Sequence, residues 1–336
     1  MTPERPERPN LNGVAIGMTP TQPELFSQGP AAPVDVSPSA AALREIADAL
    51  PASVRFGTSS WTFPGWAGLV WDRSPTPRAL GSHGLAAYVR HPLLRCVGLD
   101  RTYYDTLDEQ SFRRYREQVP DDFRFVVKAD RRLLFVDGPG SDPDLFLNPT
   151  WASDRVVAPA VEGLEETLGA LLFQFSPMPA TALGGPRAFA ERVYRFLDAL
   201  PVGPRYAVEI RTPEFLTRDY MAALHHAGAG HACVVHPSMP SVIEQLDVAP
   251  PARGLPAVVR WMLQPGHRYA DARESWAPFD RLRAPDPTRR AQVAETVSRI
   301  LEIGATPLVV VNNKAEGSAP ASIEALARQL SGGVGD

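Results

Sequence analysis

The sequence predicts an α/β fold, a TIM-like (β/α)8 barrel, and three observations lead to that prediction. Eight short apolar runs recur along residues 54–336, and stretches long enough for a helix separate them. One run and its following stretch occupy roughly 35 residues, a length typical of the strand–helix unit of such a barrel. Neither a Rossmann glycine signature nor a P-loop follows any run. The alternative that strand count alone leaves open, a doubly wound open sheet, is therefore disfavoured.

The apolar runs are rich in Val, Leu, Phe and Ile, as expected of parallel strands that are buried on both faces. The predicted strands are 54–57, 95–99, 123–129, 170–175, 205–210, 232–236, 257–262 and 307–311. Amphipathic spacing predicts helices over 189–200, 293–301 and 323–330. The sixth unit is the weakest, because the segment before the seventh strand supports only a short helix.

The N-terminal region differs from the rest in composition. Eight prolines fall within residues 1–38, with few large apolar residues between them. Such a segment cannot bury enough surface to offset its ordering entropy, so we expect a disordered arm over 1–38. A short helix and lead-in are predicted over 39–53, and the barrel over 54–336, as a single domain.

Composition excludes several classes of protein. The 336 residues carry a formal charge of −4, which gives no overall attraction to nucleic acid or anionic lipid. The two cysteines are too few for a disulfide framework. No apolar run of about 18 residues occurs, so no membrane span is predicted. The default expectation is a cytoplasmic protein that acts on a small molecule, without an obligate protein partner.

Polar residues follow each predicted strand, and the carboxyl ends of parallel strands in a barrel meet at one mouth. Any one of these residues could simply mark the point where a strand reaches water, but eight such ends together predict a site. The candidates for substrate binding are Thr58, Ser59, Asp100, Thr102, Tyr104, Gln174, Arg211, His236, Arg260, Asn312 and Asn313.

Two further strand-end residues are the candidates for catalysis. Strand alternation puts Glu209 and Arg211 on one face, which fits either a general acid/base beside an anion clamp or a structural ion pair. A buried Lys128 would have a lowered pKa, suited to proton transfer or Schiff-base formation, unless it pairs with Glu209 or Asp100.

A site without a metal or other cofactor is the expectation from histidine spacing. The sequence contains no His-x-His or His-Glu-x-x-His motif. The alternative is a divalent metal held by Glu209, His236 and Asp100.

Residues 131–154 form a long insertion after the third strand, which we expect to fold over the mouth.

Six ordered motifs resemble those of the DUF72 family, also called YecE-like. They are GTSSW at 57–61, TYY at 102–104, FRFVVKADR at 123–131, LLFQFSPMP at 171–179, YAVEIRTPEF at 206–215 and VVVNNKAEGSAP at 309–320. The resemblance implies a TIM-like barrel and membership of a bacterial-type family that has no established activity. The residues that match the family pattern are Thr58, Ser59, Lys128, Gln174, Glu209, Arg211, Asn312 and Asn313.

The sequence departs from the family pattern at two places. Gly98 and Asp100 stand where the family has glutamate and asparagine, and Leu133 and Leu134 occupy the stretch where a histidine is often found.

The main hypothesis is an enzyme acting on a small anionic or polyhydroxylated metabolite at the mouth, as an isomerase, lyase or hydrolase. Glu209 would be the general acid/base, and Lys128, Arg211 and Arg260 would clamp the anion.

Two other functions remain open from the sequence. One is a metal-dependent phosphoester hydrolase, with nucleic acid as one candidate substrate, although the net charge disfavours that partner. The other is a ligand-binding barrel without catalysis, which the departures at Gly98 and Leu133 motivate.

Overall fold

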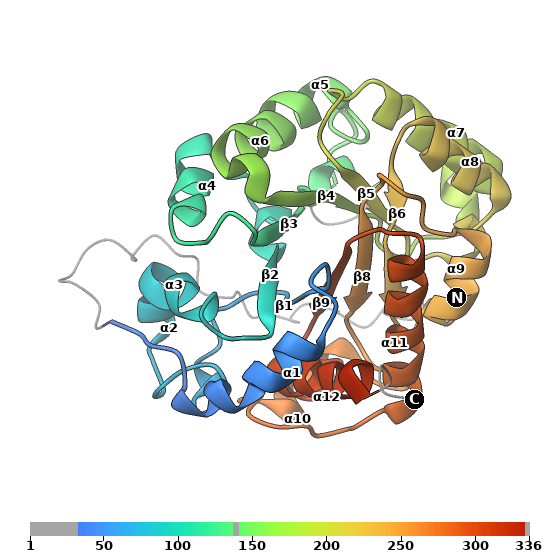
Figure 1. The fold of residues 1–336 in the computed structure, drawn as a ribbon. Coiled ribbons are helices and arrows are strands. Elements are labelled where there is room, and N and C mark those ends of the chain that lie inside the picture. Colours follow the sequence, from blue (N-terminus) through green and yellow to red (C-terminus); the bar gives the residue numbers. More distant parts are fainter. Residues whose placement is uncertain (1–32, 137–140, 333–336) are drawn as a thin grey trace, which may run out of the picture.

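Parallel strands form one sheet that curves into a barrel, and helices surround it (Figure 1). The computed structural model describes residues 33–136 and 141–332. The strands are β1 (Arg55–Thr58), β2 (Leu94–Leu99), β3 (Arg124–Lys128), β4 (Leu168–Gln174), β5 (Tyr206–Glu209), β6 (Gly230–His231), β7 (Cys233–Val235), β8 (Ala257–Trp261) and β9 (Pro307–Val311). Their order in the sheet is β6-β5-β4-β3-β2-β1-β9-β8-β7.

The first and last strands of this order are two halves of one stretch of chain. β6 and β7 are separated only by Ala232, whose amide donates to the carbonyl of Val208 on β5 at 2.8 Å. The two ends of the sheet therefore meet, as in an eight-stranded barrel whose sixth strand is interrupted. All eight predicted strands are confirmed, with boundaries within two residues of the expected ones.

Helices cover the outside of the barrel and follow the amphipathic patterns of the sequence. They are α1 (Arg44–Ala49), α2 (Pro77–Ala79), α3 (Leu85–Tyr88), α4 (Glu109–Arg116), α5 (Pro149–Ala152), α6 (Ala158–Leu164), α7 (Pro186–Asp198), α8 (Arg218–His226), α9 (Val242–Val248), α10 (Tyr269–Trp276), α11 (Pro287–Glu302) and α12 (Ala319–Gly332). The predicted helices correspond to α7, α11 and α12. The short helix of the sixth unit is α9, which begins with a capping box formed by Ser241 and Glu244.

The predicted N-terminal arm is wrong in its last residues. Residues 1–32 lie outside the described part of the chain, but Val34 is buried and Val36 forms an antiparallel bridge with Trp71. The amide of Ser37 donates to the carbonyl of Val70 at 2.8 Å. These contacts satisfy backbone groups and bury apolar side chains, so residues 34–37 are packed against the rest of the described chain. The predicted short helix is present as a 3-10 turn, Pro38–Leu43, followed by α1.

The barrel interior is filled by small and medium apolar side chains, which form a cluster separate from the larger one between strands and helices. The members of this inner cluster are Cys96, Val126, Ala170, Leu172, Ala207, Ala232, Val258, Leu308 and Val310. Side chains two residues apart on a strand share a face. The residues two positions after five of these members therefore also face inward, at the carboxyl end of the barrel: Lys128, Gln174, Glu209, Arg260 and Asn312.

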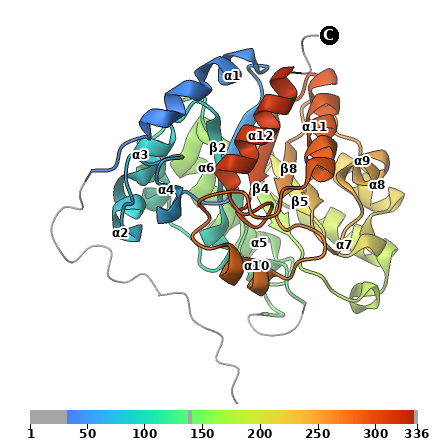
Figure 2. The ribbon, with the colours of Figure 1, turned by 90° about the horizontal axis from the view of Figure 1, so that it is seen from below.

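Additional segments lie on the mouth side of the barrel. Figure 2 shows α5 and α10 at the end of the barrel opposite to the C-terminal end of α12. The predicted insertion over 131–154 contains the 3-10 turn Arg131–Leu133 and α5, and its residues 137–140 lie outside the described part of the chain. Among the helices of residues 33–136 and 141–332, none combines the length and the apolar composition that a bilayer crossing requires.

Candidate active site at the barrel mouth

Glu209 is the centre of a buried network at the mouth. It is fully buried, and its Oε1 accepts a hydrogen bond from Arg211 Nε at 2.7 Å while its Oε2 accepts one from Arg260 Nη1 at 2.6 Å. Gln174 Oε1 accepts from Nη1 of Arg260 at 3.1 Å and from Nη2 of Arg211 at 3.3 Å. This network joins β4, β5 and β8 across the barrel.

The surroundings of Glu209 keep it ionised. Burial by itself would raise the pKa of this carboxyl, but the charges of Arg260 and Arg211 outweigh burial and lower the pKa to about 2. Both carboxylate oxygens are occupied by guanidinium groups. A group with that pKa and no free oxygen is a poor base at neutral pH, so the geometry favours Glu209 as the residue that positions the two arginines rather than as the general acid/base.

Both terminal nitrogens of Arg260 are hydrogen-bonded to other side chains of the protein. Besides Glu209 and Gln174, it bonds Asp100, whose Oδ1 and Oδ2 lie 3.0 Å and 3.3 Å from Arg260 Nη2. Asp100 is partly exposed, with 30% of its side-chain surface accessible. Arg260 is therefore saturated by contacts within the protein, and Arg211 is the more accessible of the two cations.

Lys128 lies beside this network as a buried and unpaired amine. The residue is 8% exposed, and its Nζ stands 3.5 Å from the centroid of the Tyr103 ring. It makes neither a hydrogen bond nor an ion pair with any side chain that the structure describes, so the predicted alternative of pairing with Glu209 or Asp100 is not observed. Thr102 Oγ1 lies 2.5 Å from the Lys128 carbonyl oxygen, which fixes the backbone at this position.

The environment of Lys128 makes its amine titrate near neutrality. Burial lowers the pKa of Lys128 to about 7; the charges of Arg260 and Arg211 act in the same direction, while Asp100 and Glu209 oppose them. A buried lysine with such a pKa is partly neutral at pH 7, and the neutral amine is the form that acts as a base or nucleophile.

Lys314 is a second buried amine of the mouth; it follows the last predicted strand in the sequence, but the sequence analysis gave it no catalytic or binding role. It is 5% exposed, and its Nζ donates to Asn312 Oδ1 at 3.0 Å and lies 4.2 Å from the centroid of the Tyr269 ring. Burial lowers the pKa of Lys314 to about 8, whereas the charge of Asp100 opposes this shift. The charge of Asp100 therefore raises the pKa of both amines against the effect of burial.

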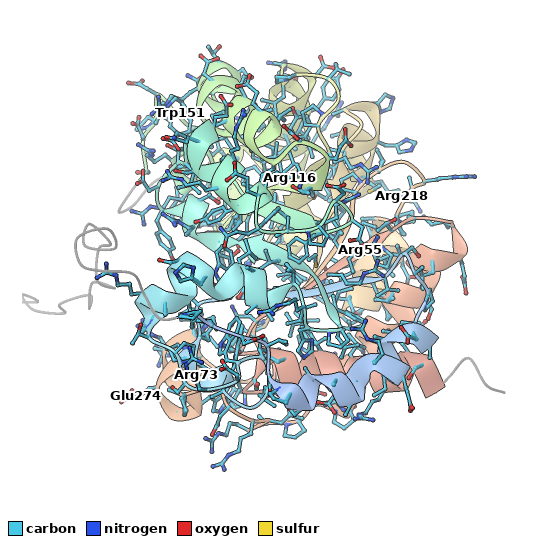
Figure 3. All side chains as sticks on the ribbon, turned by 60° about the vertical axis from the view of Figure 1, so that its left-hand side comes forward. Arg55, Arg73, Arg116, Trp151, Arg218 and Glu274 are labelled. Carbon is cyan, nitrogen blue, oxygen red and sulfur yellow. The ribbon has the colours of Figure 1, made fainter. Side chains whose placement is uncertain are left out.

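A compositional signal could have identified Lys314. Lys128 and Lys314 are the only lysines among the 34 basic residues of the chain, and all the others are arginines. Figure 3 labels three of the arginines, Arg55, Arg73 and Arg116, which lie at different places on the molecule. Arginine stays charged at any physiological pH, whereas a buried lysine can lose its proton. Both lysines of the chain are buried amines with a lowered pKa.

Four other predicted residues lie at the mouth. Asn312 Nδ2 donates to Ser59 Oγ at 2.8 Å, which links the ends of β9 and β1. His236 Nδ1 lies 2.9 Å from Ser238 Oγ; burial and the charge of Arg211 lower its pKa to about 4, so the ring is neutral at pH 7. Tyr104 is 69% exposed and meets the Tyr103 ring edge to face.

The structure turns two predicted substrate-binding residues away from the mouth. Thr58 lies on the outer face of β1, where its hydroxyl bonds that of Tyr88 on α3 at 2.9 Å. Asn313 Oδ1 accepts from Trp66 Nε1 at 3.1 Å and from the amide of Ala319 at 2.8 Å, so Asn313 anchors the start of α12. Both residues neighbour an inward-facing one, Ser59 and Asn312, and alternation points them the other way.

The charge of the mouth favours an anion. Lys128, Arg211, Arg260 and Lys314 carry positive charge in their protonated forms, against two carboxylates, Asp100 and Glu209. An excess of positive charge in a poorly solvated concavity raises the local concentration of anionic ligands.

The predicted metal-ligand set does not assemble. Asp100 and Glu209 face arginines, and His236 bonds a serine. Within residues 33–136 and 141–332, no group of three His, Cys, Asp or Glu side chains could hold a metal ion. The geometry of these residues therefore gives no support to the alternative of a metal-dependent phosphoester hydrolase.

Comparisons with known proteins agree with this fold. UPF0759 protein YecE from Escherichia coli K12 and from E. coli O157:H7 are each 28% identical to the chain over 165 residues. That match covers 49% of this chain and 51% of each relative, so it spans about half the length of either protein.

Two solved structures share the fold. The crystal structure of a DUF72 family protein from Enterococcus faecalis V583 superposes with a TM-score of 0.53 at 16% identity and covers 83% of this chain and 95% of that one. The crystal structure of a DUF72 family protein from Thermotoga maritima MSB8 gives a TM-score of 0.52 at 21% identity and covers 84% of this chain and 99% of that one. The family described as "Protein of unknown function DUF72" matches residues 55–334, and the chain belongs to this family.

Proposed function

We propose that the protein is an enzyme that binds a small anionic, polyhydroxylated metabolite at the barrel mouth and transfers a proton at a carbon next to a carbonyl group. The observation that carries this proposal is the pair of buried amines, Lys128 and Lys314, which are the only lysines of the chain. Groups whose environments move their pKa values close to neutrality are typical of acid–base groups in active sites.

Lys128 is the proposed base and Lys314 the proposed acid. Burial brings the pKa values of both amines close to neutrality. Lys314 Nζ donates to Asn312 Oδ1, which favours its protonated form, whereas Lys128 Nζ has no acceptor among the side chains that the structure describes. The C–H bond breaks, its proton passes to Lys128 Nζ, and the electron pair of that bond moves into the carbonyl group. The ammonium of Lys314 donates a hydrogen bond to the oxygen that becomes negative. Return of the proton to the same or the adjacent carbon completes an exchange or an isomerisation.

The remaining polar groups bind and orient the metabolite in this proposal. Arg211 contacts its anionic group, while Glu209 and Arg260 hold Arg211 and Gln174 in place. The hydroxyl of Ser59, already fixed by Asn312, is available to substrate hydroxyls. Glu209 thus supports the chemistry by position, and the proton-transfer role that the sequence analysis gave it passes to Lys128.

Deuterium exchange tests this function without knowledge of the product. The protein is incubated in D2O with a panel of sugar phosphates and hydroxy-keto acids, and NMR follows the loss of C–H signals. Wild type should exchange at least one metabolite, and Lys128→Met should slow that exchange by about 100-fold or more, a typical contribution of a general base. Arg192→Met, which removes an exposed cation on α7, is the matched control and should exchange at the wild-type rate.

The pH dependence of the exchange provides a second criterion. The rate should rise as pH increases through about 7, where Lys128 becomes neutral, and fall above about 8, where Lys314 loses its proton. Exchange that is independent of Lys128 would refute the proposal. Binding of panel metabolites without any exchange would also refute it and would instead indicate a ligand-binding barrel.

A further inference from the structure

A cavity of about 450 Å³ lies beside the mouth, between the carboxyl ends of β1 and β2 and helix α4. Its walls come from residues 59–62, 81–82 and 98–101 and from one side of α4. Trp61 and Tyr115, which meet edge to face with ring centroids 5.2 Å apart, form an aromatic part of the wall. Residues from four separate segments thus enclose a space that the network at Glu209 does not fill.

The inner end of the cavity is continuous with the mouth. Ser59 and Asp100 line the cavity and also belong to the mouth, through their bonds to Asn312 and Arg260. Gly98 lines it too, and a Cβ atom there would lie 3.2 Å from Val310 Cγ1 in the barrel interior. A glycine at position 98 therefore lets Ser59 and Val310 pack closely against the inner end of the cavity.

The outer part of the cavity carries two arginines without a carboxylate partner. Arg101 Nη1 donates to Tyr115 Oη at 2.7 Å, and Arg114 Nη2 lies 3.3 Å from Ser111 Oγ. Neither guanidinium forms an ion pair with any carboxylate of residues 33–136 and 141–332. Among the residues lining the cavity, the one carboxylate is that of Asp100 at the inner end.

Hydroxyl groups complete the lining of the cavity. They belong to Ser60, Thr62, Ser82 and Ser111, in addition to Tyr115. Two guanidiniums surrounded by hydroxyl donors suit a dianion with three acceptor oxygens, since guanidinium forks recognise phosphate and each hydroxyl can add a hydrogen bond. Asp100 repels an anion from the inner end, so the charged group of a ligand belongs at the outer end.

We propose that this cavity binds the phosphate of a sugar phosphate whose carbonyl end reaches Lys128. The proposal rests on the proposed function for the location of the reacting carbon, and it adds the substrate class. The phosphate contacts Arg101 and Arg114, the hydroxylated carbons pass Ser59 and Asp100, and the carbonyl carbon lies at the mouth. Asp100 can accept hydrogen bonds from the sugar hydroxyls at the point where the cavity meets the mouth.

Calorimetric titration tests the assignment with triose, pentose and hexose phosphates, each beside its unphosphorylated sugar. At least one sugar phosphate should bind wild type about tenfold or more tightly than its parent sugar, because charge-assisted hydrogen bonds to phosphate are the strong ones. Arg101→Gln and Arg114→Gln should each remove most of that difference and leave the affinity for the parent sugar unchanged. Arg113→Gln is the matched control, since Arg113 is exposed on α4 outside the cavity lining.

The outcomes separate this inference from the proposed function. Lys128→Met should retain the preference for the phosphorylated sugar while it loses deuterium exchange. Equal affinity for every sugar and its phosphate, or a preference that survives both Arg101→Gln and Arg114→Gln, would overturn the cavity assignment even if exchange is observed. A phosphate preference that depends on these arginines, without exchange in wild type, would support the cavity and refute the proton transfer.

Discussion

Replacement of Lys128 by methionine should stabilise the protein at neutral pH. The pKa of Lys128 is lowered from 10.5 to about 7, and a tenfold change in proton affinity corresponds to about 1.4 kcal/mol, so the protonated amine destabilises the fold by up to about 5 kcal/mol. Loss of the contact with the Tyr103 ring removes about 1–2 kcal/mol of favourable interaction. Methionine has similar length and no charge to desolvate, so we expect Lys128→Met to gain about 1–3 kcal/mol at pH 7.

The pH dependence of this gain follows from the direction of the pKa shift. Between pH 10.5 and about 7, the unfolded chain binds a proton at Lys128 that the folded protein does not bind. Wild-type stability from this residue therefore falls as pH decreases through that range and is constant below it. The methionine variant lacks this pH-dependent contribution to the free energy of unfolding. Its stability relative to wild type should therefore increase from pH 10 to pH 7 and level off at lower pH.

Urea unfolding followed by far-ultraviolet circular dichroism measures the free energy of unfolding of both proteins across this pH range. Arg192→Met is again the control and should match wild type within about 0.5 kcal/mol at each pH. Two results would show that folding does not lower the pKa of the Lys128 amine. One is a Lys128→Met protein that is less stable than wild type, and the other is a stability difference that does not vary with pH.

Three further changes follow from the same contacts. Glu209→Gln should destabilise the protein by about 3–5 kcal/mol at pH 7, because it leaves the buried Arg260 and the partly buried Arg211 with too little negative charge. Glu295→Gln, at an exposed position of α11, is the control, and equal stability of the two variants in urea unfolding would contradict the network. Lys314→Arg should keep a positive charge at all pH values, so the decline of deuterium exchange above pH 8 should disappear, and an unchanged bell-shaped profile would exclude Lys314 as the acid. Asn313→Ala should reduce stability by about 2 kcal/mol or more without changing the exchange rate per folded molecule, since Asn313 bonds Trp66 and the start of α12; a selective loss of exchange would instead place it in the site.

The fold could be predicted from the sequence because strands buried on both faces have a distinctive composition. All eight strands are short apolar runs, and helices with a clear apolar face, such as α7 and α11, separate several of them. The error at residues 33–38 has a local cause. Val34 and Val36 resemble their proline-rich surroundings in sequence, and the bridge between Val36 and Trp71 forms only in the folded chain.

The site could be predicted only in part, because a strand end identifies a residue but not its partners. Alternation from the inner cluster correctly leads to Lys128, Glu209 and Arg260, yet the roles depend on contacts across the barrel. That Arg260 is saturated by Glu209, Gln174 and Asp100 is invisible in the sequence. Lys314 lies just after a strand end, where the backbone no longer alternates and inward direction cannot be deduced.

The pKa values of the two lysine amines test the central claim most directly. Protein labelled with carbon-13 at lysine Cε contains only two labelled residues, and Lys314→Met assigns the remaining signal to Lys128. NMR titration of wild type should give midpoints of about 7 for Lys128 and about 8 for Lys314. Two midpoints near 10.5, the value of a solvated lysine, would contradict the account, because freely protonated amines at the mouth could not supply the base on which the proposed chemistry depends.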